Sequence, residues 1–329
     1  MLKLFERNTV IQVVFILVIT TLLWVRSFAD PQPMTDTGEF APLYSLLCSM
    51  AIPPTLTIVI ALILVILGGL LFNIMLTNAG LAKQNSLFPT LLFIVFMSAG
   101  NTSLSPVFLA TLITIPFVNR FLLRSSHLDI APDKIFSAAA LIGVASMLYL
   151  PSLALVIAYI FIAINHRLYG WRNWMMFLLG LLAPYILLWA ILLFKGGLVD
   201  SFIAIGSQFG TLNLQVGDFT PLQGMANVFL LAVLAVSLFV IWRRIGESNV
   251  FWQKNAATVI FIAVASLVVL PFSQPFPVNF QFFALPFTFC LDQRFYHSHR
   301  RSSPFHKKDW HNYLYDLLFI LVILAAIAC

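Results

Sequence analysis

Long apolar runs separated by short polar connections dominate this chain. A helix needs roughly 20 apolar residues, with a range of about 17–25, to cross a bilayer. The runs are continuous and do not alternate, which is typical of helices and not of membrane strands. The candidate segments are residues 9–25, 53–80, 87–99, 105–122, 135–150, 152–166, 174–194, 223–242, 255–271, 279–291 and 312–328. The sequence therefore predicts an all-α, polytopic integral membrane protein with about eleven transmembrane helices.

Four of these segments are short, namely 87–99, 135–150, 152–166 and 279–291. Short segments punctuated by Pro or Gly indicate tight hairpins or partly re-entrant helices, which membranes tolerate only where protein covers them. Pro151 divides the clearest pair, "GVASMLYLPSLALVIAYIFIAI". That pair is either two spans or one broken helix.

The composition agrees with a membrane protein. Of the 329 residues, 61% are hydrophobic and 9% are charged, whereas a soluble globular protein carries roughly 25% charged residues. No linker or repeat divides the chain, so we expect one membrane domain over residues 1–329. Its largest connections are two outer loops, about 26–52 and 195–222, and a basic inner loop, about 292–311.

The basic residues predict the orientation of the chain, because Lys and Arg accumulate on the cytoplasmic side. With a cytoplasmic N-terminus and eleven crossings, sixteen of the 18 basic residues lie inside, and only Arg26 and Lys195 lie outside. Topology thus explains the net charge of +6, and no nucleic-acid partner is expected. This map predicts a multi-pass membrane protein with its N-terminus in the cytoplasm.

The N-terminal segment has a second interpretation. Lys3 and Arg7, an apolar run and the small residues of "SFA" before Asp30 resemble a signal peptide with its cleavage site. The run is long for such a peptide, so a retained first span is the favoured interpretation. A mature protein that starts at Asp30 would lack this span.

Three carboxylates follow the first span directly: Asp30, Asp36 and Glu39. The predicted map places them on the outer face, where carboxylates act as a general base, bind a divalent cation through oxygen, or solvate a loop. The three cysteines have neither disulfide nor zinc spacing. The sequence therefore assigns no metal site and no cofactor, and a divalent cation at the acids remains an open alternative.

The segment "EFAPLYSLLCSMAI" after these acids bunches its apolar residues behind Pro42. We expect a short helix lying at the membrane interface, with Phe40, Leu43, Leu46 and Leu47 towards lipid.

A first span, an outer loop that bears acids, an interfacial helix and many further spans together resemble the GT-C class of membrane glycosyltransferases. This resemblance implies a polyprenyl-phosphate-linked sugar as substrate at the outer face, with Glu39, Asp36 or Asp30 as the catalytic base. The chain lacks the adjacent acids and the large soluble domain that many members carry. The candidate substrate contacts on the same face are Arg26, Tyr44, Asn101, Lys195 and Gln208.

The whole chain also resembles a family of multi-pass inner-membrane proteins from Bacteroidota. The shared features are "LFERN", "NAGLAKQNSLFPTLLFIVFMS" and "ALPF…W…YLYDLLFILVIL". This resemblance implies a membrane and a compartment, and no activity. Two further hypotheses therefore stay open. One is a non-catalytic membrane subunit or scaffold that binds protein partners. The other is a transporter or flippase, disfavoured because no predicted span carries an acid near its middle.

Overall fold

The computed structural model describes residues 9–29, 31–34, 41–50, 52–83, 86–98, 104–122, 131–195, 203, 205–206, 221–246, 248–269 and 280–301. Within these ranges every regular element is a helix and none is a strand. The elements are α2 (Thr9–Ala29), α3 (Pro42–Ser49), α4 (Pro54–Asn78), α5 (Phe88–Met97), α6 (Pro106–Phe121), α7 (Pro132–Leu148), η1 (Leu150–Ala154), α8 (Leu155–Asn165), α9 (Trp171–Lys195), α11 (Pro221–Ile245), α12 (Val250–Val269), η2 (Phe280–Phe283) and α14 (Ala284–Arg301).

The helices fall where the apolar runs predict them. Ten of the eleven predicted segments overlap a helix, and segment 312–328 lies outside the described residues. Three described helices are long and apolar enough to cross a bilayer: Pro54–Asn78, Trp171–Phe194 and Val250–Val269. The chain is thus a helical protein with a bilayer as its environment, and a total of eleven crossings is not established. Helix α14 also continues to Arg301, into the segment predicted as an inner loop.

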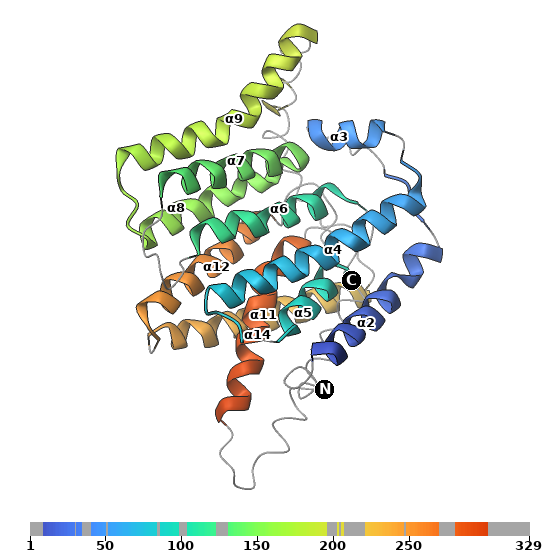
Figure 1. The fold of residues 1–329 in the computed structure, drawn as a ribbon, viewed down its shortest axis with the longest axis vertical. Coiled ribbons are helices and arrows are strands. Elements are labelled where there is room, and N and C mark those ends of the chain that lie inside the picture. Colours follow the sequence, from blue (N-terminus) through green and yellow to red (C-terminus); the bar gives the residue numbers. More distant parts are fainter. Residues whose placement is uncertain are drawn as a thin grey trace.

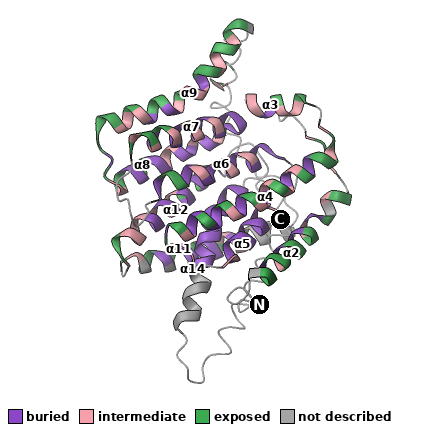
Figure 2. Ribbon diagram, in the orientation of Figure 1, coloured by how far each residue is buried: buried purple, intermediate pink, exposed green. Residues whose placement is uncertain are grey.

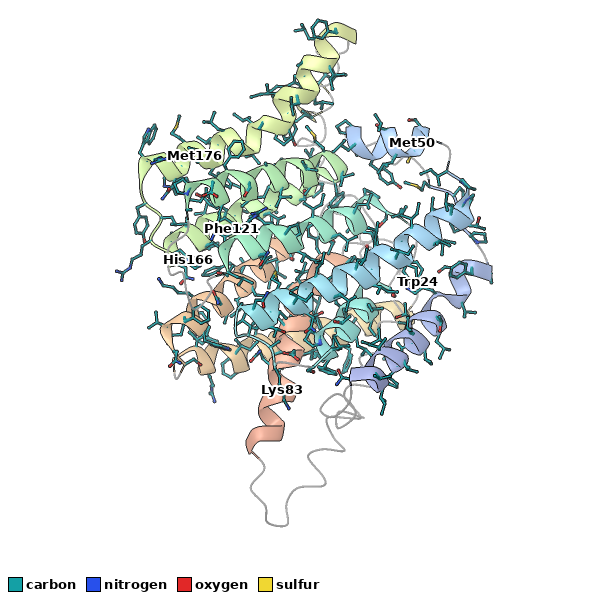
Figure 3. All side chains as sticks on the ribbon, viewed as in Figure 1. Trp24, Met50, Lys83, Phe121, His166 and Met176 are labelled. Atoms are coloured by element: carbon teal, nitrogen blue, oxygen red, sulfur yellow. The ribbon has the colours of Figure 1, made fainter. Side chains whose placement is uncertain are left out.

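On one side of the bundle, hydrogen bonds join the ends of three helices, α8, α12 and α4. The Asn165 side chain at the end of α8 donates to the carbonyl of Lys254 in the first turn of α12. The Asn255 side chain donates in turn to Ala79 at the end of α4. We call this side the inner end of the bundle and the opposite side its outer end. Lys83 and His166 lie on the inner side and Trp24 and Met50 on the outer side, at the right of Figure 3.

Burial varies strongly between the helices. All ten residues of α5 are buried, and so is α14 from Ala284 to Gln293. Helix α5 and the first part of α14 lie inside the bundle, whereas α2 and α9 at its edges expose large apolar side chains (Figures 1 and 2). An apolar outer surface suits a lipid environment, and the edge helices still contribute buried residues to the core, such as Trp24 of α2 and Phe177 of α9.

Small residues bring α7 and α9 into close parallel contact. A Cβ added to Gly180 would lie 2.3 Å from the carbonyl oxygen of Phe136, and one added to Gly143 would lie 2.7 Å from that of Leu181. Close backbone approach through small residues is the usual way in which membrane helices pack without a hydrophobic driving force. This contact holds α9 against the bundle along α7 (Figure 1).

The helical path breaks at Pro151, as the sequence predicts. Helix α7 ends at Leu148, Tyr149 adopts an extended conformation with φ −149° and ψ 105°, and a 3₁₀ turn then leads into α8. Proline cannot continue the hydrogen bonds of α7, because it lacks an N–H group. The break therefore separates two helical segments instead of kinking one.

Candidate functional site

Helix α5 is shorter than α4 and lies beside its middle part. The Thr90 hydroxyl donates to the carbonyl of Gly69 on α4 at 3.3 Å, which aligns the two helices. At a rise of about 1.5 Å per residue, α4 extends about 12 Å beyond α5 at the outer end and about 10 Å at the inner end. Both ends of α5 thus lie deep in the bundle, where each free backbone group needs a partner.

Side chains from distant helices supply these partners at the outer end. The Gln281 amide donates to the carbonyl of Met97 at 3.1 Å, and its oxygen faces the Ser105 hydroxyl at 3.5 Å. The Trp24 indole donates to the Ser98 hydroxyl at 2.9 Å. We call these four side chains the outer polar layer: Trp24, Ser98, Ser105 and Gln281.

Helix α14 begins beside this layer, and its sequence explains the local geometry. Pro286 lacks the N–H group that would donate to Phe282 in a regular helix. The Ser266 hydroxyl of α12 lies 3.2 Å from that carbonyl oxygen and replaces the missing donor. The outer polar layer is therefore built around two helix ends, those of α5 and α14, at similar depth.

At the inner end, three amide side chains hold the connection between α4 and α5. The backbone N–H of Leu87 donates to Gln12 at 2.8 Å, and Asn255 donates to Ala79 at 3.0 Å. Gln293 of α14 donates to Leu81. We call these side chains the inner polar layer: Gln12, Asn255 and Gln293. They come from α2, α12 and α14, so one connection joins three helices.

A glycine allows this connection to turn back into the bundle. Gly80 has φ +68°, and the next backbone N–H, of Leu81, donates to Leu76 at 2.9 Å. Glycine adopts this left-handed conformation without a steric penalty, which is why it commonly ends helices. Leu81 is then buried, while Gly80 and Lys83 on either side of it are exposed, so the connection turns a single apolar side chain back into the bundle.

Asp292 is a buried carboxyl group directly after the apolar segment of α14 that ends at Leu291. It is 6% exposed, and burial raises its pKa to about 7 because a low-dielectric environment disfavours the charged form. Thr288, one helical turn away, is fully buried, and its hydroxyl has no partner among the described residues. A carboxyl group of this kind changes its charge near neutral pH.

His166 is a second titratable group at the inner end. Burial and the nearby charge of Lys254 lower its pKa to about 4, so the imidazole is neutral at pH 7. Its Nε2 lies 3.1 Å from the Thr258 hydroxyl, which itself donates to the carbonyl of Lys254. The imidazole therefore donates through Nε2, and it serves to connect α8 to α12.

The predicted catalytic acids Asp30, Asp36 and Glu39 lie outside the described residues, and their roles remain predictions. The residues beside them are described. Met34 and Ala41 pack into one apolar cluster with Leu148 at the outer end of α7. The acid-bearing loop thus leaves from and returns to the outer side of the bundle.

The predicted interfacial helix corresponds to α3, at Pro42–Ser49. Leu46 and Met50 are exposed, and Leu43 and Leu47 are half-buried. Tyr44, a predicted substrate contact, is 3% exposed in the apolar cluster with Leu148. Helix α3 thus rests on α7, and its exposed residues are the apolar Leu46 and the polar Ser49.

The other predicted contacts are only partly placed. Arg26 belongs to α2 and Lys195 is the last residue of α9, but their side chains are not among those described. Asn101 and Gln208 lie outside the described residues. Both helix ends lie on the side that we call the outer end, and that this side faces out of the cell remains a prediction.

Sequence reasoning missed two buried polar groups, Gln281 of η2 and Asp292 of α14. Gln281 stands in an apolar segment among four phenylalanines, and Asp292 adjoins the basic residues of the inner loop. The signal for Asp292 was the mainly apolar segment "ALPFTFCL" directly before it. This segment is buried on all sides, and the burial extends along the helix to Asp292. Nothing in the sequence indicates which backbone groups these side chains contact.

No known protein family, curated protein or solved structure matches this chain. Among the described residues, no three His, Cys, Asp or Glu side chains gather in a way that would hold a metal ion. The candidate chemistry therefore depends on the geometry of the two polar layers and on the acid-bearing loop.

Proposed function

We propose that this chain is a GT-C-like membrane enzyme that acts on a polyprenyl-phosphate-linked sugar at the outer face of a bacterial inner membrane. The observation that carries the proposal is the anchoring of the acid-bearing loop. Met34 and Ala41, on either side of Asp36 and Glu39, pack at the outer end of the bundle. A carboxylate there can serve as general base for an acceptor hydroxyl.

The surroundings of this loop suit a lipid-linked substrate. Helix α3 follows it directly and exposes Leu46 and Met50, as a helix in contact with acyl chains would. The outer polar layer provides hydroxyl and amide groups about 12 Å below the outer end of α4, a depth that a phosphate or sugar head group can use only inside protein. Glu39 or Asp36 is the proposed base, with Asp30 as the alternative.

The test is a lipid analysis of cells that lack the gene. If the enzyme consumes a polyprenyl-phosphate-linked sugar, that lipid accumulates in the deletion strain and falls again when the wild-type gene returns. The double variant Asp36→Asn, Glu39→Gln should fail to lower it, while Asp133→Asn, an exposed acid at the inner end of α7, should restore it fully. Full restoration by the double variant would end the catalytic proposal.

A second function, that of a non-catalytic membrane subunit, is favoured by α9. Its outer half turns away from the bundle in Figure 1, and Leu187, Leu193 and Phe194 are 69%, 65% and 89% exposed. A partner helix would cover this surface. Purification in mild detergent should then yield a stoichiometric partner, and a monodisperse monomer would count against the subunit.

A further inference from the structure

The connection between α8 and α9 presents two cations and two aromatic rings at the inner end of the bundle. Tyr169 is 62% exposed and Trp171 is 78% exposed, and the arginines on either side of them are exposed as well. We call these four residues the α8–α9 patch: Arg167, Tyr169, Trp171 and Arg172. Tyr and Trp rings combine an apolar body with a polar edge, which is why they gather where a membrane meets water.

The backbone beneath this patch is anchored to the bundle. Leu168 is buried, and its N–H group donates to the carbonyl of Ala163 at 2.9 Å. The Tyr169 hydroxyl donates to the carbonyl of Ile164 at 3.2 Å. His166 connects the same turn to α12. The four exposed side chains therefore extend from a connection that hydrogen bonds hold against two helices.

Arg167 has a backbone conformation that its side chain does not favour. Its φ is +57°, and it is the one residue other than glycine with a positive φ in the described part of the chain. Glycine commonly ends a helix in this conformation, whereas a residue with a Cβ bears a steric cost. Termination of α8 alone would thus favour glycine, so the arginine is best explained by what its exposed side chain binds.

Two further cations lie next to the patch. Lys254 of α12 accepts a hydrogen bond from Asn165 through its carbonyl, and its charge acts on His166. Lys134 lies in the first turn of α7, two residues before Phe136, whose carbonyl oxygen faces α9 at Gly180. Positive charge thus surrounds the α8–α9 connection on the side of α12 and on the side of α7.

Few acids oppose this charge. Asp133 of α7 is exposed, and neither Arg167 nor Arg172 forms an ion pair with a described residue. Asp129 and Glu247, in the connections that precede α7 and α12, lie outside the described residues. The described surface around the patch is therefore complementary to an anion.

Helix α9 continues from the patch with exposed apolar side chains. Met175, Leu178, Leu179 and Leu182 are all exposed within the next three turns. A ligand that fits both parts of this surface has an anionic head and an apolar tail. A soluble anion or an acidic protein segment would use the cations and leave the apolar wall uncovered.

We propose that the α8–α9 patch binds the head group of an anionic phospholipid in the leaflet at the inner end of the bundle. The guanidinium groups of Arg167 and Arg172 pair with the phosphate oxygens, to which arginine donates two parallel hydrogen bonds. Tyr169 and Trp171 lie at the boundary between head group and acyl chains, and the chains run along α9. This site is independent of the outer-face activity proposed above.

Native mass spectrometry of the purified full-length protein tests the proposal. The protein is titrated with phosphatidylglycerol and, separately, with phosphatidylcholine that carries the same acyl chains. The double variant Arg167→Asn, Arg172→Gln should weaken phosphatidylglycerol binding by about 30-fold, the effect of two cations near an anionic head group, and leave phosphatidylcholine binding unchanged. Asn is chosen because it tolerates the left-handed conformation of residue 167. Unchanged phosphatidylglycerol binding would overturn the proposal.

A matched control separates this patch from the general charge of the inner end. Lys83 and Arg243 are exposed cations on other helices, and Lys83 lies well apart from His166 in Figure 3. The double variant Lys83→Gln, Arg243→Gln removes the same charge and should leave phosphatidylglycerol binding unchanged. An equal loss in both double variants would mean that the lipid responds to net charge and not to the patch.

A competition experiment identifies the lipid as the ligand. Glycerol 3-phosphate carries a phosphate without acyl chains, so it should not displace phosphatidylglycerol from the wild type at equal concentration. Displacement would show that the patch is a site for soluble phosphates, and the assignment to a phospholipid would fail.

Discussion

Among the described glycines, Gly180 has the least room for a larger side chain. A methyl group there would meet the Phe136 carbonyl oxygen at 2.3 Å, and a backbone atom cannot rotate away. Gly170 is a matched control, because a Cβ at that position meets only the Asn173 side chain, at 3.7 Å. The two glycines are close in sequence: Gly180 lies inside α9 and Gly170 directly before it, and only Gly180 packs against a backbone atom of another helix.

We predict that Gly180→Ala lowers the free energy of unfolding by about 3 kcal/mol, the upper end of the cost of overpacking a core. Gly170→Ala should change it by less than about 0.5 kcal/mol. Circular dichroism during denaturation of the detergent-solubilised protein measures both. Equal stabilities of the two variants would mean that α9 does not pack on α7 in this register.

His166 makes stability depend on pH in a defined direction. Its pKa is lowered from 6.5 in the unfolded chain to about 4 in the folded protein, so the unfolded state binds a proton first. The contribution of His166 is complete above about pH 6.5 and is lost as the pH falls towards 4. The loss amounts to about 3 kcal/mol at most, from the size of the shift.

We therefore expect His166→Gln to be less acid-sensitive than the wild type. Glutamine keeps a donor for Thr258 and cannot gain a charge. Thermal melting of both proteins between pH 4 and 7 measures this. The difference in melting temperature between the wild type and His166→Gln should shrink or reverse below pH 6. Asp292 titrates in the same pH range, and its effect on stability has the opposite dependence on pH. The result is therefore the difference in melting temperature between the variant and the wild type, not the melting curve of either protein alone.

At the scale of helices, α5 depends on its two amide contacts. Gln12 satisfies its first turn and Gln281 its last. Replacing either residue by Leu leaves a buried backbone group without a partner, which costs about 1–3 kcal/mol. Gln32, which is exposed, provides the control substitution Gln32→Leu.

The measurement for α5 is amide hydrogen exchange followed by mass spectrometry. In Gln281→Leu we expect faster exchange in the peptide that covers Phe88–Ser98, and in Gln32→Leu no change there. Unchanged protection in both variants would show that α5 is held by apolar packing alone.

The positions of the helices could be predicted from sequence, because apolar runs and prolines mark them. Pro42, Pro54, Pro106 and Pro132 each lie at the first helical turn, where a missing N–H costs nothing. The break at Pro151 follows from the same chemistry. What the sequence could not reveal is which helices lie inside, since α4 and α5 are both apolar, yet all of α5 is buried and α4 exposes part of its surface.

The polar layers were beyond sequence reasoning for a related reason. A buried Gln and an exposed Gln look alike until the partner is known, and the partner of Gln281 is a carbonyl 184 positions away. The prediction that short segments are covered by protein was nevertheless confirmed for α5, whose residues are all buried.

For the whole molecule, the sorting of charges predicts the orientation. Among the described residues, Arg120, Lys134, Arg167 and Arg172 lie at or next to the inner ends of α6, α7, α8 and α9. If cations mark the cytoplasm, this face points into the cell.

Cysteine labelling tests this orientation. In a variant without the native cysteines, Ser49→Cys in α3 should react with a membrane-impermeant thiol reagent in intact cells. Gly170→Cys, between α8 and α9, should react only after lysis. Both positions are exposed in the structure, so access does not limit labelling. The reverse pattern would invert the protein and remove the acid-bearing loop from the outer face.

The shortness of α5 has an electrical consequence. Its polar ends are separated by about 15 Å, half of the roughly 30 Å hydrocarbon thickness of a bilayer. A transmembrane voltage falls mainly across apolar material, so along this path it would fall over half the usual distance. The local field would be about twice that in the surrounding lipid, and a charge moving near either end of α5 would respond to voltage accordingly.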